Sequence, residues 1–340
     1  MPILGINYPW TVLDGKPNYG CDFGRNIWGS HAGVSMHEAE VRADFEAMAT
    51  MGVQVARWFV FTDGRGGVKW DGDGHVVGLA DGFFDDLDAA LTIARDTNVR
   101  ICLVLFDFTW MMHGEELDAD FHTQPDALRT VDGAASIFKH IIDPLLARYG
   151  TYGPAGELGR AIHSFDVINE PDWVTRGLAL NHSRIQGSLR PLVRPFSRDE
   201  LRHFVRGVAD RVHAASESLV TVGGGRAKFA AEWDKPVYGL DFVQVHLYPD
   251  AQHPERDRDI VGKPCRDLGV WKRVLIGECP AHADREHPPS HAPVPYRLAD
   301  YLAMARSGGY LGVWPWSFKG VDEFGAVNPD EYRDAFAVHT

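Results

Sequence analysis

Short, nearly continuous apolar runs alternate with amphipathic helical patterns from one end of the chain to the other. Runs of this length, rich in Val, Ile, Leu and Phe, are typical of strands buried on both faces of a parallel sheet. We predict eight strands, which are Ile3 to Tyr8, Val53 to Phe61, Arg100 to Phe108, Ile162 to Asn169, Leu219 to Gly223, Asp241 to Tyr248, Arg273 to Glu278 and Tyr310 to Phe318. Eight strands separated by helices favour a closed (β/α)₈ TIM barrel of the α/β class over an open sheet.

Two helix starts are marked by capping boxes, in which a Ser and a Glu three residues later each satisfy a backbone N–H of the other. One box is Ser35 to Glu38 and the other is Ser197 to Glu200. The apolar spacing from Phe83 to Thr97 predicts a third amphipathic helix. No linker, repeat or low-complexity tract interrupts the alternation, so we expect residues 1–340 to form a single domain.

Three of the connections that follow predicted strands are long and rich in polar or turn-forming residues. They are Thr62 to Gly82, which we expect to contain a small hairpin, Pro171 to Phe196 and Pro280 to Pro295. All three leave the carboxyl ends of strands, and barrel enzymes carry their active sites on that face. We therefore expect these loops to wall off a substrate groove, with plain surface elaboration as the alternative.

The charge balance narrows the choice of partners. The chain carries 47 Asp and Glu against 34 Lys and Arg, a formal net charge of −13. Binding to phosphate or to anionic lipid needs basic surface, so neither nucleic acid nor a membrane is an expected partner. No stretch approaches the roughly 20 apolar residues of a membrane span. The N-terminus lacks the features of a signal peptide, so we expect a cytoplasmic protein; a secreted protein whose export signal has been removed is the alternative.

Motifs for metals and cofactors are not evident. None of the four cysteines has C-x-x-C spacing, so neither a disulfide framework nor a zinc site is expected. Three histidines crowd the connection after the seventh strand, at His282, His287 and His291, but prolines between them interrupt any helical metal-binding spacing. No glycine-rich phosphate loop follows the first strand, and no G-x-S-x-G motif is present. We therefore expect no metal and no cofactor.

The candidate chemistry lies in two glutamates at strand ends. The fourth strand runs into Asn169-Glu170-Pro171, and the seventh ends in Gly277-Glu278. Cleavage of a glycosidic bond uses such a pair of carboxyl groups, one protonated to assist the leaving oxygen and one ionised to attack the anomeric carbon. Mutual repulsion and partial burial separate the two pKa values and thereby divide the roles. The alternative is that one or both are solvated loop residues.

With these strand ends, the chain resembles the large clan of retaining barrel glycosidases that includes the cellulase and β-mannanase families, and is family 5-like over nearly its whole length. In that clan an Asn-Glu pair ends the fourth strand and a lone Glu ends the seventh. The resemblance implies that Glu170 is the acid/base, that Glu278 is the nucleophile, and that Asn169 hydrogen-bonds the sugar 2-hydroxyl.

Four further positions agree with this resemblance. Arg57 matches the arginine that braces the nucleophile, and a charge-assisted hydrogen bond would keep Glu278 ionised. His246 and Tyr248 match a His-x-Tyr element, in which Tyr248 would donate to the nucleophile and His246 would contact the sugar or the acid/base. Trp316 matches the platform on which a pyranose stacks, because sugar C–H faces pack well on indole. Ordinary core packing is the alternative for each.

Two positions after predicted strands depart from the pattern. Thr109 stands where cellulase-like members often carry a histidine, and this weakens a cellulase assignment. Trp110 is instead expected to contact sugar, as aromatic residues near that strand do in mannanase-like relatives. Cys279 is also unusual directly after the nucleophile.

The resemblance as a whole implies a retaining glycoside hydrolase that acts on an oligosaccharide or polysaccharide through a covalent glycosyl-enzyme. A β-mannoside or β-mannan is the favoured substrate, and β-glucan is next. The alternatives are a catalytically silent carbohydrate-binding barrel and a transglycosylase that uses the same residues.

Overall fold

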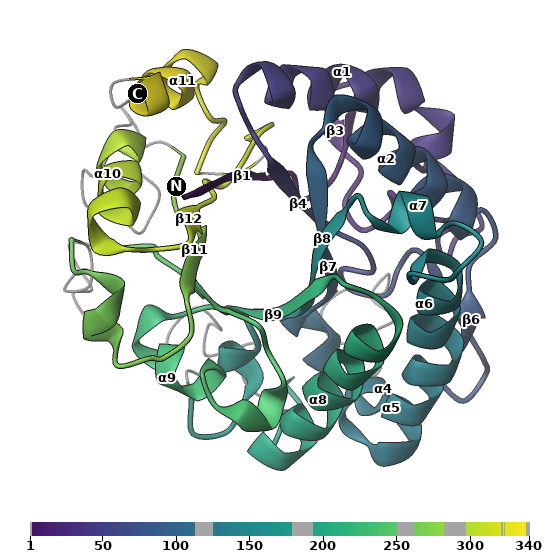
Figure 1. The fold of residues 1–340 in the computed structure, drawn as a ribbon. Coiled ribbons are helices and arrows are strands. Elements are labelled where there is room, and N and C mark those ends of the chain that lie inside the picture. The colour runs from purple at the N-terminus through teal and green to yellow at the C-terminus, as the bar shows by residue number, and fades with distance from the viewer. Residues whose placement is uncertain are drawn as a thin grey trace.

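The computed structural model describes residues 2–112, 125–178, 193–249, 262–281, 297–320, 322 and 324–337. Eight parallel strands close into a barrel in the order β1-β12-β11-β10-β9-β8-β7-β4, which confirms the predicted (β/α)₈ architecture. The barrel strands are β1 (Ile3–Asn7), β4 (Val55–Phe59), β7 (Arg100–Asp107), β8 (Ile162–Asn169), β9 (Leu219–Gly224), β10 (Val243–His246), β11 (Val274–Glu278) and β12 (Gly312–Val313). Figure 1 looks along the barrel, with the strands at the centre and the helices around them.

The outer layer consists of amphipathic helices whose apolar faces cover the strands. Its main helices are α1 (Glu38–Thr50), α2 (Phe83–Thr97), α5 (Val131–Ile137), the π-helix η3 (Phe138–Ile142), α6 (Asp143–Tyr149), α8 (Arg198–Ala215), α10 (Leu298–Gly308) and α11 (Pro329–Ala337). The helix α2 has the predicted bounds. The predicted capping box at the start of α8 is also confirmed, because Ser197 and Glu200 each accept a hydrogen bond from the backbone of the other. Within the described ranges, no helix combines the length and the apolar character needed to cross a membrane.

The other predicted capping box is wrong. Ser35 lies in a short 3₁₀ turn, η1 (Val34–Met36), and α1 begins after His37, whose side chain makes no capping bond. The Ser35 backbone N–H and hydroxyl instead donate to Asp86 Oδ1, at 2.9 and 2.5 Å. Asp86 is fully buried on α2, and a buried carboxylate needs hydrogen-bond donors. Ser35 supplies two of them and therefore does not cap the helix.

The eighth strand is much shorter than the predicted run from Tyr310 to Phe318. Regular pairing of β12 stops at Val313, two residues before Pro315. Proline has no N–H to contribute to a ladder, so the chain continues beside β11 through single contacts such as Trp316 N–H to Cys279 O at 2.8 Å. This irregular end carries Trp316 to the mouth of the barrel.

The barrel interior is layered. A separate apolar cluster fills one end of the interior and contains Val55, Cys102, Phe242, Leu275, Leu311 and Trp314. The indole of Trp314 fits only because residue 5 is a glycine: a Cβ there would lie 2.3 Å from the indole nitrogen. A second apolar cluster of Phe59, Val104 and Trp316 lies at the mouth, and the buried polar side chains Arg57 and Asp166 come from the strand segments between the two clusters. Those polar groups support the site.

The structure describes part of the long connections. The expected hairpin between Thr62 and Gly82 is confirmed as the antiparallel pair β5 (Val68–Trp70) and β6 (Val76–Leu79). A second small pair, β2 (Val12–Leu13) and β3 (Lys16–Pro17), follows β1. Most of the other two long connections lies outside the described residues, and so do His282, His287 and His291.

Candidate active site

The two strand-end glutamates meet at the mouth of the barrel. Glu278 is the last residue of β11, and Glu170 follows β8 with a left-handed backbone (φ 47°) at the start of the 3₁₀ turn η4 (Pro171–Val174). Both are buried, and His246 at the end of β10 lies between them, with Nδ1 3.0 Å from Glu170 Oε1 and 3.4 Å from Glu278 Oε2. An oxygen of each carboxyl group and the imidazole nitrogen all lie within 4.8 Å of one another. Two acids this close can serve one scissile bond.

Arg57 on β4 holds Glu278 in place. The guanidinium is fully buried and donates to Glu278 Oε1 at 2.6 Å, to Asn7 at 2.9 Å and to Asn169 at 2.7 Å. Its Nε and Nη2 also donate to Asp166 Oδ2, at 3.0 and 2.9 Å. Burial alone would lower the pKa of Arg57, but the charges of Asp166 and Glu278 raise it above its usual value. The arginine is therefore a fixed positive charge against the Glu278 carboxyl.

A tyrosine completes the surroundings of Glu278. The Tyr248 hydroxyl donates to Glu278 Oε2 at 2.8 Å, so each oxygen of this carboxyl accepts a hydrogen bond. One of the two donors is charged, and charge-assisted bonds are the stronger kind. The pair stabilises negative charge on Glu278, as a nucleophile requires.

Glu170 has a different set of neighbours. The Trp173 indole N–H donates to its Oε2 at 2.9 Å, and His246 lies against its Oε1. The turn that carries Trp173 is fixed by a bond from the Arg226 backbone N–H to Asp172 at 3.1 Å. Glu278, in contrast, lies 2.6 Å from the fixed cation of Arg57. Such an asymmetry suits an acid and a nucleophile in one site.

Asn169, which precedes Glu170, is fixed at both ends of its amide. Its Oδ1 accepts from Arg57, and its Nδ2 donates to Asp107 Oδ2 at 2.8 Å. Asp107 ends β7 and is the ladder partner of Asn169 on β8. Burial raises the pKa of Asp107 to about 7; hydrogen bonds from Asn169 and Thr109 oppose the rise, and the Glu170 charge adds to it.

These residues open onto a cleft with a cavity volume of about 230 Å³. Of the residues predicted for the site, Glu170, Glu278, Asn169, Tyr248 and Trp316 line it. Its aromatic lining also includes Trp10, Tyr19, Phe59, Phe108 and Phe324. Trp316 packs edge-on against Trp10 and Phe59, with ring centroids 6.1 and 6.0 Å away, and its indole N–H donates to Asp322. The cleft combines apolar ring faces with a few polar groups, as sugar-binding sites do.

One predicted contact is placed differently. Trp110 does not line the cleft: its side chain is fully buried beside Phe106 and Trp70, with ring centroids 5.1 and 5.3 Å away. The 3₁₀ turn η2 (Phe108–Met111) begins directly after β7 and places the indole in the core, so the expected sugar contact is corrected to a packing role. His246 is also fully buried, and it makes the predicted contact with Glu170.

Several residues of the site were not predicted from the sequence. Asn7, Asp166 and Gln244 lie in strands and form the buried support of Arg57: Gln244 donates to Asp166 Oδ2 at 2.7 Å, and Asn7 donates to the Gly277 carbonyl at 2.8 Å. Asp107 was missed as well. Its signal was an acidic residue at the carboxyl end of a buried run, the same position that identified Glu170 and Glu278.

The trio Glu170, His246 and Glu278 has the spacing of a metal site. Its fit to a cation is poor, because both oxygens of Glu278 already accept from Arg57 and Tyr248. The fixed charge of Arg57, 2.6 Å from Glu278, would also repel a divalent ion. These contacts favour a site for acid/base chemistry over one that holds a metal.

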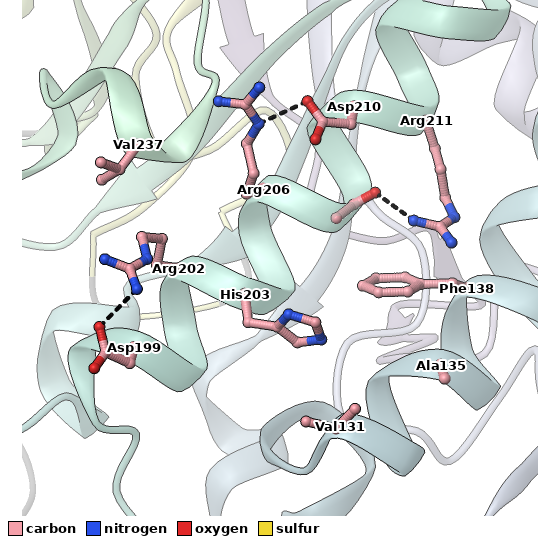
Figure 2. Close-up of a pocket in the computed structure, with 11 residues that line it drawn as sticks. Val131, Ala135, Phe138, Asp199, Arg202, His203, Arg206, Asp210, Arg211 and Val237 are labelled. Carbon is pink, nitrogen blue, oxygen red and sulfur yellow. Dashed lines mark hydrogen bonds and ion pairs between the residues drawn. The ribbon is translucent and has the colours of Figure 1, made fainter.

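A larger hollow, about 730 Å³, lies on the outer wall between α5, η3 and α8. Figure 2 shows its charged side chains paired locally, with Arg202 against Asp199 and Arg206 against Asp210. The guanidinium of Arg211 lies 4.2 Å from the ring of Phe138. The hollow lies on the helical layer and not at the strand ends, where barrel enzymes carry their active sites. The cleft therefore remains the candidate active site although the hollow is larger.

Comparison with known proteins supports the fold. No family model matches the chain. Among curated proteins, the rice (Oryza sativa subsp. japonica) mannan endo-1,4-β-mannosidase 1 is 24% identical over 263 residues, which are 70% of this chain and 57% of the relative. The chain thus spans a little over half the length of that relative.

Solved structures with the same barrel include β-mannanases. The β-mannanase of the blue mussel Mytilus edulis has a TM-score of 0.70 at 19% identity, over 98% of this chain and 90% of the other. The β-1,4-mannanase of the sea hare Aplysia kurodai has a TM-score of 0.72 at 17% identity, over 99% and 92%. The chain therefore has the (β/α)₈ fold of these enzymes, and the resemblance noted at the strand ends is confirmed at the level of the fold.

Proposed function

We propose that the protein is a retaining glycoside hydrolase whose favoured substrates are β-mannosides or β-mannan, with β-glucan next. The observation that carries the proposal is the pair Glu170 and Glu278, with carboxyl oxygens within 4.8 Å of each other around one imidazole. Retaining glycosidases hold their two carboxyl groups about 5–5.5 Å apart, whereas inverting enzymes separate them by about 6.5–9.5 Å to admit a water molecule. The mannanases with the same fold support mannan as the substrate class.

In the first step Glu278 attacks the anomeric carbon while Glu170 gives its proton to the departing oxygen. The carbon–oxygen bond to the leaving group breaks, and a glycosyl ester forms on Glu278. Arg57 and Tyr248 suit Glu278 to this role, because their hydrogen bonds stabilise its charge before attack. Trp173 and His246 keep the Glu170 carboxyl directed at the same point.

In the second step Glu170, now ionised, takes a proton from water as the water oxygen attacks the anomeric carbon. The ester bond breaks, Glu278 is released as a carboxylate, and the sugar leaves with its original configuration. Trp316 is the platform for the ring, and its position at the mouth is fixed by Asp322, Trp10 and Phe59. A transglycosylase would differ only in the acceptor that resolves the ester.

The binding-only alternative is disfavoured by the same geometry. A barrel that merely holds carbohydrate has no need to bring two acids together, nor to bury Arg57 against one of them. Buried charge of this kind is characteristic of sites that perform chemistry.

The experiment is sugar release from β-mannan, β-glucan, xylan and aryl β-glycosides by the wild-type protein, with Glu278→Gln and Glu170→Gln beside it. We expect release from the mannosides, lost by at least about 1,000-fold in Glu278→Gln. Sugar binding without release from any of these substrates would instead support the binding-only barrel.

A further inference from the structure

Three polar side chains form one wall of the cleft near Asn169. Asp107, Thr62 and Thr109 all line the cavity, and the Asp107 backbone N–H donates to the Thr62 carbonyl at 3.1 Å. Thr62 adopts a left-handed backbone (φ 38°), which is uncommon for a β-branched residue, and such conformations cluster at functional sites. The wall therefore comes from the ends of two neighbouring strands, β4 and β7.

The two threonine hydroxyls have hydrogen-bonding capacity to spare. Thr62 Oγ1 is buried and has no partner among the residues that the structure describes, and the buried Thr109 Oγ1 has only the neighbouring Asp107 carboxyl within reach. Buried hydroxyls usually have well-aligned partners, so these two beside one cavity point to a ligand that supplies further bonds. A sugar ring carries hydroxyl groups that both donate and accept.

Asp107 retains acceptor capacity towards the same space. Its Oδ2 accepts from Asn169 Nδ2 at 2.8 Å and its Oδ1 from the Thr109 backbone N–H at 3.0 Å. A carboxylate offers about four acceptor positions, so at least one remains even when the Thr109 hydroxyl is a third donor. No Lys, Arg or His within the described ranges forms an ion pair with it, although it is only 5% exposed. A buried acid without a cation is costly, and such a residue in a cleft is a candidate for ligand binding.

We propose that Asp107, with Thr62 and Thr109, binds ring hydroxyls of the sugar held at Trp316, and that Asp107 is a specificity-determining residue of this site. Its carboxyl accepts from one hydroxyl, while its bond to Asn169 fixes the adjacent amide towards the same ring. An amide donor and a carboxyl acceptor on paired residues of β8 and β7 suit two neighbouring hydroxyls. The inference rests on the proposed glycosidase function and assigns this wall its role within it.

The charged surroundings agree with the assignment. Glu170 and Asp107 repel each other when both are ionised, and this contributes to the raised pKa of Asp107. Tyr19 faces Asp107 from the segment after β3; burial, then the charges of Asp107 and Asp63, raise its pKa well above its usual value, so it stays a neutral hydroxyl. A sugar hydroxyl that donates to Asp107 would favour the ionised carboxyl over the protonated one.

The test compares Asp107→Ala, Thr109→Val and wild type on aryl β-mannosides that lack one hydroxyl each, at C2, C3, C4 or C6. We expect Asp107→Ala to lower kcat/KM on the parent glycoside by roughly 10- to 100-fold. On the deoxy substrate that lacks the contacted hydroxyl, the same substitution should cost less than about 3-fold. Equal losses on the parent and on every deoxy substrate would show a structural role and overturn the inference. Thr109→Val keeps the shape of the side chain and removes only the hydroxyl beside Asp107, so its kcat/KM should fall while its unfolding midpoint changes little.

Asp22→Asn is the matched control. Asp22 is also a buried acid whose pKa is raised by burial, to about 6, but its partners are Thr11, Asn18 and Trp58, and it does not line the cleft. Its substitution should lower the unfolding midpoint without changing the ranking of the deoxy substrates.

If the wild type hydrolyses nothing, the proposed function fails separately, and calorimetric titration with mannobiose decides the inference. Weaker binding to Asp107→Ala then supports it, and equal or absent binding to both proteins overturns it.

Discussion

Arg57 donates from Nη1 to Glu278 Oε1 at 2.6 Å, although β4 and β11 are not neighbours in the barrel. The same guanidinium donates to Asn169, the residue before Glu170. One fully buried side chain therefore links both halves of the proposed catalytic pair. The position of Glu278 depends on the barrel interior more than on the loops at the mouth.

Replacement of Arg57 should damage both stability and activity. Arg57→Met leaves Asp166 and Glu278 buried without their cation, so we expect the free energy of unfolding to fall by about 3–5 kcal/mol. Arg57→Lys keeps the charge but cannot reproduce five directed bonds, so its loss should be intermediate. Denaturant unfolding together with kcat/KM on an aryl β-mannoside measures both. Wild-type stability in Arg57→Met would contradict the proposed support role.

Tyr248→Phe should separate catalysis from stability. It removes one donor to Glu278 at 2.8 Å, and we expect kcat to fall by roughly 10- to 100-fold with a stability change of about 1 kcal/mol or less. The matched control is Tyr149→Phe, which removes a 2.6 Å bond to Asp88 away from the cleft. Kinetics and thermal unfolding of both variants check this. A similar kcat in Tyr248→Phe and Tyr149→Phe would remove Tyr248 from the mechanism.

Substitution of two tryptophans should affect substrate binding in one case and stability in the other. Trp316→Ala removes the platform at the cleft, and we expect KM for mannan oligosaccharides to rise about 10-fold or more. Trp110→Phe shortens a fully buried core residue, so it should lower the unfolding midpoint and leave KM nearly unchanged. Initial-rate kinetics with thermal unfolding distinguish the two. A raised KM in Trp110→Phe would restore the sugar contact first predicted for it.

The ionisation of Asp107 should be visible in stability. Its pKa is about 7 in the folded protein and near 3.8 otherwise, so the folded state binds the proton more tightly. This contribution is fully present below about pH 4 and is lost as the pH rises through 7, at most about 4 kcal/mol. Asp107→Asn does not titrate, so its stability relative to wild type should increase over that window. A constant difference in unfolding free energy between pH 4 and 8 would contradict the assignment.

The sequence predicts the barrel well because its strands are apolar runs buried on both faces. Boundaries of β8 agree to the residue, and α2 does as well. The length of the eighth strand was overestimated. The apolar run looks continuous in the sequence, but Pro315 within it cannot donate to a hydrogen-bond ladder, so regular pairing ends before it. The prediction of a capping box at Ser35 was wrong for a different reason. The Ser35 hydroxyl donates to Asp86, which is remote in sequence, and does not cap the helix.

Site residues at the ends of strands could be predicted from the sequence. Those whose contact with the cleft depends on the direction of the side chain were harder to predict. Glu170, Glu278, Arg57, Asn169 and Tyr248 converge at the cleft or directly beneath it. Trp110 lies within the 3₁₀ turn that follows its strand, and the direction in which that turn points the indole is not visible in the sequence. Asp107 also ends a buried strand, but no motif around it marks it as a site residue.

The most direct measurement is the anomeric configuration of the first sugar released, followed by proton NMR during hydrolysis of an aryl β-mannoside. Carboxyl oxygens of Glu170 and Glu278 within 4.8 Å of each other match the short separation of retaining enzymes, so we expect the β-anomer first. The α-anomer as the first product would show inversion by direct attack of water, and would contradict the assignment of Glu278 as the nucleophile.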